Sequence, residues 1–256
     1  MAIRERMMSE KVIAALRRVR ASARMEPSVL GALMIVVLGV LAFITLADDM
    51  AESDGRAFDQ AVLTWMQPVA GEPRGPWWLR EAALDITSLG GIAVLSLFAV
   101  ATVGFLLIQK KRLSALLLTL GLVGGVTLSE GLKALFERER PPAAYQAVET
   151  LNASFPSGHA LMSTVFYLSV AVMLARAFPT KRLKTYVLGV GMTLAGLVGL
   201  TRVYLGAHWA TDVLAGWCVG AAWAMALWLA AYGATRLQTA RHAPPQDGAF
   251  PENTPR

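Results

Sequence analysis

The sequence predicts an all-α, polytopic membrane helical bundle with six transmembrane helices and a short amphipathic helix on the outer face. Of its 256 residues, 55% are hydrophobic and only 16% are charged, whereas soluble domains carry about a quarter charged residues. The apolar residues also fall into separate runs, each close to the roughly 20 residues that cross a bilayer as a helix. The net charge of +6 is best explained by cytoplasmic loops beside anionic lipids. No basic stretch is interleaved with aromatic residues, so we expect no nucleic-acid partner.

The chain divides into three parts. Residues 1–28 form a basic segment with seven Lys and Arg residues, which we expect to lie in the cytoplasm and to precede an uncleaved membrane anchor. Residues 29–232 form the six-helix membrane domain. Residues 233–256 form a cytoplasmic tail, which we expect to be disordered because it is rich in proline and poor in apolar residues.

The first span is expected at residues 29–47, and acidic residues at 48–54 give it an outside-type flank. Phe58, Val62, Trp65 and Met66 then recur at helical spacing. This pattern predicts a short amphipathic helix that lies on the membrane surface. The alternative is that this helix only covers the outer mouth of the bundle.

The other five spans follow after an aromatic pair. Trp77 and Trp78 resemble an anchor at the membrane interface. The spans themselves are expected at residues 88–108, 113–132, 160–175, 186–200 and 211–232.

The distribution of cations sets the expected topology. Basic residues after the second and fourth spans, at 110–112 and 176–184, mark cytoplasmic loops. Six spans then leave both termini in the cytoplasm. Four cations, Lys133, Arg138, Arg140 and Arg202, fall instead on the outer side, where cations have no topological reason to gather. Cations placed against this bias indicate an anionic ligand at the outer membrane surface.

The first of three motifs runs from Lys133 to Pro141. A lysine offers a compact charge and Arg140 a planar fork, and both suit phosphate oxygens. Glu137 and Glu139 are expected to hold the neighbouring arginines in place. Taken alone, the motif also fits an ordinary charged helix end.

The second motif is Phe155–His159, directly before an apolar run. Ser157 is placed to cap or begin that helix, and backbone N–H groups at a helix N-terminus form an anion site that Gly158 leaves open. His159 can there donate a proton to a departing oxygen. A capping serine beside an interfacial histidine is the simpler alternative.

The third motif contains Arg202, Gly206, His208 and Asp212. His208 and Asp212 are four residues apart, so on a helix they share a face and the carboxylate can reach the imidazole. That pairing fixes which ring nitrogen holds the proton and leaves the other free to attack or bind. Gly206 allows a sharp turn that returns Arg202 towards the same place. An ion pair at a membrane-helix end is again the alternative.

Together the three motifs resemble those of the type 2 phosphatidic acid phosphatase superfamily, membrane lipid-phosphate phosphatases related to vanadium haloperoxidases. Their internal spacing and their order fit, and the resemblance covers most of the chain from the first to the sixth span. One departure is Thr201, where the family commonly has serine before the arginine. Threonine keeps the hydroxyl group, so we expect little effect.

The resemblance implies a phosphatase that needs neither metal nor cofactor. His208 is the implied nucleophile, which forms a phosphohistidine, with Asp212 orienting it and His159 as general acid. The implied phosphate-binding residues are Lys133, Arg140, Arg202, Ser157 and Gly158. Phosphoryl transfer mainly needs positioning and charge neutralisation, and these residues offer both. Histidines with ordinary pKa values of about 6.5 predict a bell-shaped rate profile at mildly acidic to neutral pH.

The expected substrate is a lipid phosphate or pyrophosphate at the outer, periplasmic face of a bacterial inner (plasma) membrane. Undecaprenyl diphosphate is the first choice. Phosphatidylglycerophosphate, phosphatidate and lipid A phosphate are alternatives, as is phosphoryl transfer to another lipid. An anion transporter predicts charged residues at mid-membrane, of which the spans show almost none, and a soluble haloperoxidase is excluded by the hydropathy. The oligomeric state is left open.

Overall fold

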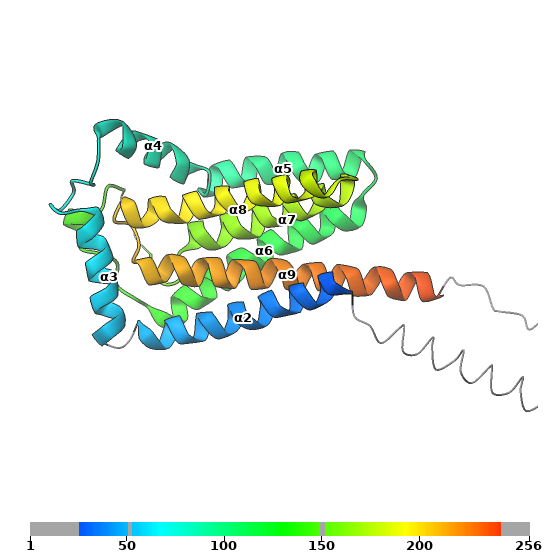
Figure 1. The fold of residues 1–256 in the computed structure, drawn as a ribbon, viewed down its shortest axis with the longest axis horizontal. Helices are drawn as coiled ribbons and strands as arrows, with labels where there is room; N and C mark the ends of the chain where they lie inside the picture. Colours follow the sequence, from blue (N-terminus) through cyan, green and yellow to red (C-terminus); the bar gives the residue numbers. More distant parts are fainter. Residues whose placement is uncertain (1–25, 51–52, 149–151, 242–256) are drawn as a thin grey trace, which may run out of the picture.

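In this computed structural model, residues 26–50, 53–148 and 152–241 are described. Within those ranges the chain is helical, and Figure 1 shows long helices side by side with a short helix, α3, across one end. The elements are α2 (Pro27–Asp49), α3 (Ser53–Met66), α4 (Trp77–Ser88), α5 (Ile92–Ile108), α6 (Arg112–Phe136), the 3-10 turn η1 (Ala143–Tyr145), α7 (Gly158–Ala177), α8 (Lys181–Tyr204) and α9 (Ala210–Arg241).

Six membrane spans are present in the described residues if one bent pair counts as a single span. Helices α2, α6, α7, α8 and α9 are each long and apolar enough to cross a bilayer, and α4 with α5 forms a span bent by 47°. The predicted six-span bundle is thus confirmed. The second span differs from the prediction because it begins with α4 at Trp77, eleven residues before the predicted start at residue 88. Gly90 and Gly91 separate α4 from α5, and glycine is a poor helix former.

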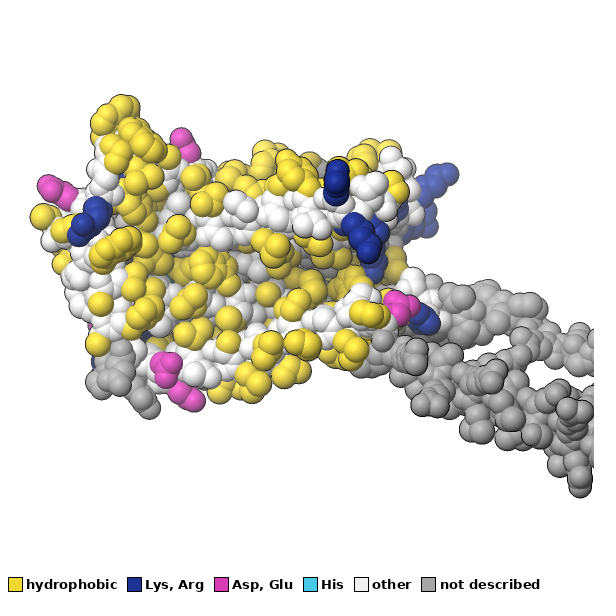
Figure 2. Space-filling view, viewed as in Figure 1, with side chains coloured by type: hydrophobic (Ala, Val, Ile, Leu, Met, Phe, Trp, Pro, Cys, Tyr) yellow, Lys and Arg dark blue, Asp and Glu magenta, His cyan; other side chains and the backbone are white. Residues whose placement is uncertain are grey.

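The surface of the bundle matches a lipid environment. Large apolar side chains such as Met34, Val100 and Val123 are more than half exposed along its sides. Figure 2 shows lysine and arginine side chains gathered at the end where α5 turns into α6 and α7 into α8. The opposite end, where α3 lies, carries most of the acidic side chains seen in this view.

Helix α3 is amphipathic, as predicted, although it begins at Ser53, five residues before the predicted pattern. Its inner face buries Asp59 and Leu63, and Gln67, directly after the helix, is buried on the same side, as a spacing of four residues predicts. Trp65 on the outer face is 64% exposed. The Gln67 amide donates to the Tyr204 carbonyl over 2.9 Å. The helix is therefore fixed to the bundle by one face, while its other face is exposed.

Helix α7 lies at the centre and contacts α6, α8 and α9, while α2 runs along α9. Helix α9 continues to Arg241, so residues 233–241, which we predicted to belong to the tail, are helical. Arg236 pairs with Glu26 beside the start of α2, and alanine, leucine and arginine in this stretch are good helix formers. The predicted basic segment, except for residues 26–28, and the tail beyond residue 241 lie outside the described residues.

Candidate active site

A cavity of about 1020 Å³ opens at the α3 end of the bundle and continues between α5 and α6. Its polar end is lined by Lys133, Arg140, Gly158, His159, Arg202 and His208. Three helices, α6, α7 and α8, and two loops contribute these side chains. Six of the eight predicted site residues therefore face one space. The other two, Ser157 and Asp212, are fully buried behind it.

His208 lies in the short loop between α8 and α9. Gly206 turns this loop with φ of +65°, a left-handed conformation that glycine adopts without steric cost. The backbone N–H groups of Ala207 and His208 then donate to the Arg202 carbonyl over 3.0 and 3.2 Å. As predicted from Gly206, the turn brings Arg202 and His208 to the same place.

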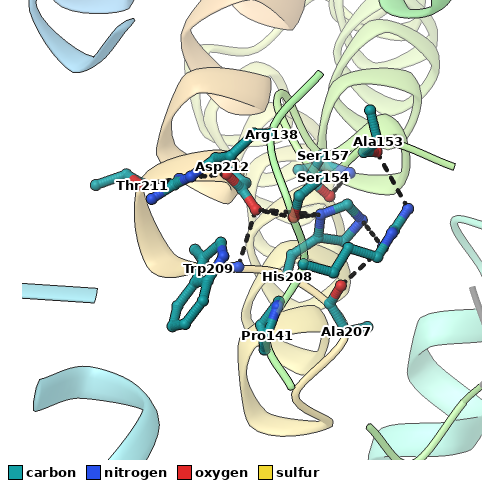
Figure 3. Close-up of polar contacts among 12 residues, drawn as sticks. Arg138, Pro141, Ala153, Ser154, Ser157, Ala207, His208, Trp209, Thr211 and Asp212 are labelled. Atoms are coloured by element: carbon teal, nitrogen blue, oxygen red, sulfur yellow. Dashed lines mark hydrogen bonds and ion pairs between the residues drawn. The ribbon is translucent and has the colours of Figure 1, made fainter. Parts of the chain in front are cut away.

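The contacts of the imidazole fix its tautomer. His208 Nε2 lies 3.2 Å from Arg140 Nη1, and because arginine can only donate, Nε2 must accept. The proton of the neutral ring is therefore on Nδ1, which faces Asp212 Oδ2 at 3.4 Å. Figure 3 shows the His208 ring beside Asp212 and Ser154, and its other nitrogen lies next to the Arg140 guanidinium. Nε2 is thus left with a lone pair on the cavity side.

Burial keeps this ring neutral. Removal from water lowers the pKa of His208 to about 4, and the Arg140 and Arg202 charges act in the same direction. The hydrogen bond and charge of Asp212 oppose the change without cancelling it. An imidazole with this pKa is unprotonated at neutral pH, as a nucleophile must be.

Asp212, in the first turn of α9, is held by three donors besides the His208 ring. Its Oδ2 accepts from the Trp209 backbone N–H over 2.9 Å and from the Ser154 hydroxyl. The Trp209 contact is the reciprocal half of a capping box, in which the third helical residue reaches back to the N-cap. The other oxygen, Oδ1, accepts from Arg138 over 2.5 Å. The orientation of the carboxylate towards His208 is therefore set by its surroundings.

Arg140 and Arg202 reach the cavity by different means. Arg140 is held by three backbone carbonyls, those of Asn152, Ala153 and Ala207. Arg202 is 4% exposed, and one Nη donates to the Thr87 hydroxyl of α4 over 3.2 Å. Both guanidinium groups are anchored on one side and face the cavity with the other.

Two buried polar atoms on the cavity wall have no hydrogen-bond partner among the described residues, Ser129 Oγ and Arg202 Nε. Buried polar groups are nearly always paired, so two unpaired donors among the residues that line one cavity indicate a ligand rich in acceptors. A Cβ atom added to Gly158 would lie 3.3 Å from Ser129 Oγ and 3.4 Å from Lys133 Nζ. The missing side chain therefore keeps the space between the α7 N-terminus and these two groups open.

The remaining predicted residues surround the start of α7. The Lys133 ammonium pairs with Glu130 over 2.8 Å and still lines the cavity. His159 packs against the break between α4 and α5, with its ring 3.3 Å from the position of a Cβ on Gly90. Ser157 is the N-cap of α7 and accepts from the Ala160 N–H, as predicted for a cap. It does not line the cavity, so its side chain supports the anion site rather than facing it.

Some residues of the site were not predicted from the sequence. Glu137 and Glu139 were expected to hold the arginines, which is wrong: Arg138 pairs with Asp59 and Asp212, and Arg140 binds backbone carbonyls. Asp59 carried one usable signal, because it lies four residues before Leu63 on the buried face of an amphipathic helix. A carboxylate in that position needs a buried partner.

No group of three or more His, Cys, Asp or Glu side chains suited to a metal ion occurs in the described part of the chain. The charged residues that line the cavity are Lys133, Arg140, Arg202 and Glu130, and Glu130 pairs with Lys133, so the net charge of this set is positive. The arrangement therefore combines a neutral imidazole with cations that suit a phosphoryl group.

Comparison with known proteins supports this assignment. The family model described as the PAP2 superfamily matches residues 112–236, from α6 into α9, which includes all three motifs. Phosphatidylglycerophosphatase B of Bacillus subtilis (strain 168) is 35% identical over 144 residues, or 56% of this chain and 70% of that protein. The chain belongs to the PAP2 superfamily. As a PAP2 phosphatase, it is a multi-pass membrane enzyme that hydrolyses lipid phosphates.

Three further comparisons agree with this family or with its fold. Undecaprenyl-diphosphatase of Sulfolobus acidocaldarius is 31% identical over 120 residues, which is 45% of this chain and about half (54%) of that protein. The crystal structure of a transmembrane PAP2 type phosphatidylglycerolphosphate phosphatase from Bacillus subtilis superposes with a TM-score of 0.70 at 29% identity and covers 78% of this chain and 96% of its own. Aquifex aeolicus LpxE, at 22% identity and a TM-score of 0.50 over 66% of this chain and 93% of its own, shares the fold.

Proposed function

We propose that this PAP2 phosphatase removes the terminal phosphoryl group of a lipid phosphate or diphosphate at the outer, periplasmic face of the inner membrane. The reaction passes through a phosphohistidine on His208. Undecaprenyl diphosphate is the first-choice substrate. One observation carries the proposal: Nε2 of His208, which accepts a hydrogen bond from Arg140, faces a cavity that has three cations at one end and an apolar groove at the other.

In the first step, His208 Nε2 attacks the phosphorus atom and the bond from phosphorus to the leaving oxygen breaks. Arg140, Arg202 and Lys133 neutralise the charge on the phosphoryl oxygens. Before substrate binds, Arg140 Nη1 lies against His208 Nε2. The oxygens of the incoming phosphoryl group then accept hydrogen bonds from the N–H groups of Arg140 that backbone carbonyls do not hold. His159 gives its proton to the leaving oxygen, and Asp212 stabilises the positive charge that develops on the His208 ring.

In the second step, water attacks the phosphohistidine. His159, now unprotonated, takes the proton of that water as general base, which is the reverse of its first role. The nitrogen–phosphorus bond breaks, phosphate leaves and the neutral ring is restored with its proton on Nδ1. Three cations and the N-terminus of α7 supply the charge stabilisation at every stage, so this route requires no metal ion or cofactor.

The apolar part of the cavity supports a lipid substrate. Side chains of α5 and α6 line it, and those of α5 run from Ile92 to Leu107, a distance of about 23 Å along a helix. Ile92, Val100 and Val123 are 60–87% exposed on the flank of the bundle, so the groove is open to the bilayer. A lipid chain can lie there while its phosphate reaches His208. A single groove favours a single-chain lipid such as undecaprenyl diphosphate.

Phosphatidylglycerophosphate is the second candidate. The Bacillus subtilis relative with 35% identity and the structure with a TM-score of 0.70 are both named for activity on this lipid. Its terminal phosphoryl group is a monoester, and the cavity holds the same three cations for it.

The outer location is supported by the cations at the ends of the bundle. Basic residues at 110–112 and 181–184 lie at the turns opposite the site, and cytoplasmic loops are enriched in Lys and Arg. With that end in the cytoplasm, the site faces the periplasm and both termini lie inside.

The test is phosphate release by the purified protein from a panel of lipid phosphates, with EDTA present throughout. We expect release from undecaprenyl diphosphate or phosphatidylglycerophosphate, unchanged by EDTA. We expect no release by His208→Ala. His242→Ala is the matched control, because the same change is made at a histidine outside the three motifs.

Rapid quenching with a ³²P-labelled substrate should trap the label on His208. Full activity in His208→Ala, or an acid-stable label on another residue, would refute the mechanism. Loss of activity with EDTA alone would refute its independence of metals.

A further inference from the structure

Helix α3 does not line the cavity, yet one of its carboxylates reaches the back of the site. Asp59 is 1% exposed. Its Oδ2 accepts from Arg138 Nη2 over 2.6 Å and from the Thr211 hydroxyl over 2.6 Å. Its Oδ1 accepts from the Thr211 backbone N–H over 2.9 Å. A residue more than 150 positions away thus caps the first turn of α9, which carries Asp212.

Arg138 connects the two carboxylates. Its Nη1 donates to Asp212 over 2.5 Å and to Thr211 over 2.7 Å, while Nη2 binds Asp59. The guanidinium is 11% exposed and both acids are almost completely buried. The result is a continuous chain of contacts from α3 through Arg138 and Asp212 to His208.

The charges in this chain affect the imidazole. Arg138 alone would neutralise Asp212 and weaken its stabilisation of a positively charged His208 ring. Asp59 offsets the arginine, so the three groups together carry one net negative charge next to the ring. Charges buried this deeply are poorly screened by salt or water.

We propose that Asp59 is a positioning residue for the reaction: through Arg138 it keeps the Asp212 carboxylate oriented and negatively charged towards His208. This proposal rests on the proposed function, in which His208 is the nucleophile. It also assigns α3 a role beyond membrane contact, since the helix delivers one of the charges on which the nucleophile depends.

The proposal predicts how the pH dependence of activity changes when the charges of residues 59 and 138 are altered. The groups facing His208 come from five segments: Asp212 from α9, Arg202 from α8, His159 from α7, Lys133 from α6 and Arg140 from the loop between α6 and η1. None of these five residues is substituted when residues 59 and 138 are varied. The acid limb of kcat/KM against pH, which reports the His208 ring in the free enzyme, should therefore follow the charge of Asp59 and Arg138 alone.

The experiment measures kcat, KM and pH profiles with dioctanoylglycerol phosphate in detergent micelles. Asp59→Asn should lower kcat on the order of tenfold, which corresponds to about 1.4 kcal/mol, with KM little changed. Arg138→Gln leaves two unneutralised acids and should move the acid limb to higher pH. The Arg138→Gln and Asp59→Asn double variant restores the net charge and should bring the limb back towards that of the unmodified enzyme.

Two controls separate this role from a structural one. Asp59→Glu disturbs packing but keeps the charge, and should leave the acid limb in place. Asp85→Asn makes the same chemical change at an exposed acid of α4, at the same end of the bundle, and should change neither kcat nor the limb.

The proposal is overturned if Arg138→Gln and the double variant share one acid limb, or if folded Asp59→Asn keeps full kcat. If Asp59→Asn alone does not fold, as judged by its thermal midpoint, the comparison of Arg138→Gln with the double variant decides. ³²P trapping on the unmodified enzyme separates the two proposals. Absence of phosphohistidine there refutes the proposed function, whereas normal trapping with unshifted limbs refutes only the role of Asp59.

Discussion

Burial of the His208 ring determines how activity responds to acid. A histidine with its ordinary pKa of 6.5 is only about 3% neutral at pH 5. With the pKa lowered to about 4 by burial, about 90% of the ring stays neutral at that pH. The nucleophile requires the neutral form, so lowering the pKa extends activity towards acid. The acid limb should therefore lie near pH 4, below the mildly acidic range that ordinary histidine values predict.

The assay is kcat/KM from pH 3.5 to 8, because this ratio reports the ionisation of the free enzyme. Between pH 7 and pH 5 we expect the contribution of His208 to fall by about a tenth, whereas an ordinary histidine would reduce it about 25-fold. Substrate ionisation is separated by comparing a lipid monophosphate with a lipid diphosphate. A limb that belongs to the enzyme falls at the same pH with both substrates.

An acid limb near pH 6.5 with both substrates would refute the reasoning, because it would mean that water reaches the ring. The same shift in pKa has a consequence for stability. Between pH 6.5 and about 4 the unfolded chain binds a proton at His208 and the folded protein does not, so this residue makes folding less favourable as the pH falls through that window.

Three substitutions test other contacts of the site. Ser129→Ala should raise KM by roughly fivefold, the equivalent of one neutral hydrogen bond, without lowering the thermal midpoint, since this hydroxyl has no protein partner to lose; an unchanged KM would contradict its contact with substrate. Thr87→Val should lower kcat/KM by roughly fivefold because Arg202 loses a positioning contact, and stopped-flow binding of phosphate should weaken in parallel. Gly158→Ala should lower kcat/KM by on the order of tenfold or more, since the added Cβ crowds the Lys133 ammonium, and activity equal to that of the unmodified enzyme would show that phosphate binds elsewhere.

The three motifs could be predicted from the sequence because each is a local pattern with a local cause. Gly206 sets the turn before His208, Ser157 caps α7, and the spacing of four places Asp212 under the imidazole. Hydropathy and the placement of cations were enough to put them on one membrane face. The spans were found for the same reason, since length and apolar character are properties of a continuous segment.

Contacts between distant segments were not predictable in this way. Ser154 and Arg138 bind Asp212 across 58 and 74 positions of the chain. No pattern in the residues next to them predicts these contacts. Helix α4 was missed because it is moderately polar and precedes the apolar run of α5. Asp59 was hidden within a segment whose amphipathic pattern suggested only contact with the membrane.

The groove between α5 and α6 has a consequence for how this enzyme meets its substrate. Because it opens on the flank of the bundle, a lipid can diffuse sideways within one leaflet and reach the cations without ever crossing water. The relevant concentration is then a mole fraction in the membrane plane. Adding inert lipid or detergent should slow turnover by surface dilution even when the bulk amounts of enzyme and substrate stay the same.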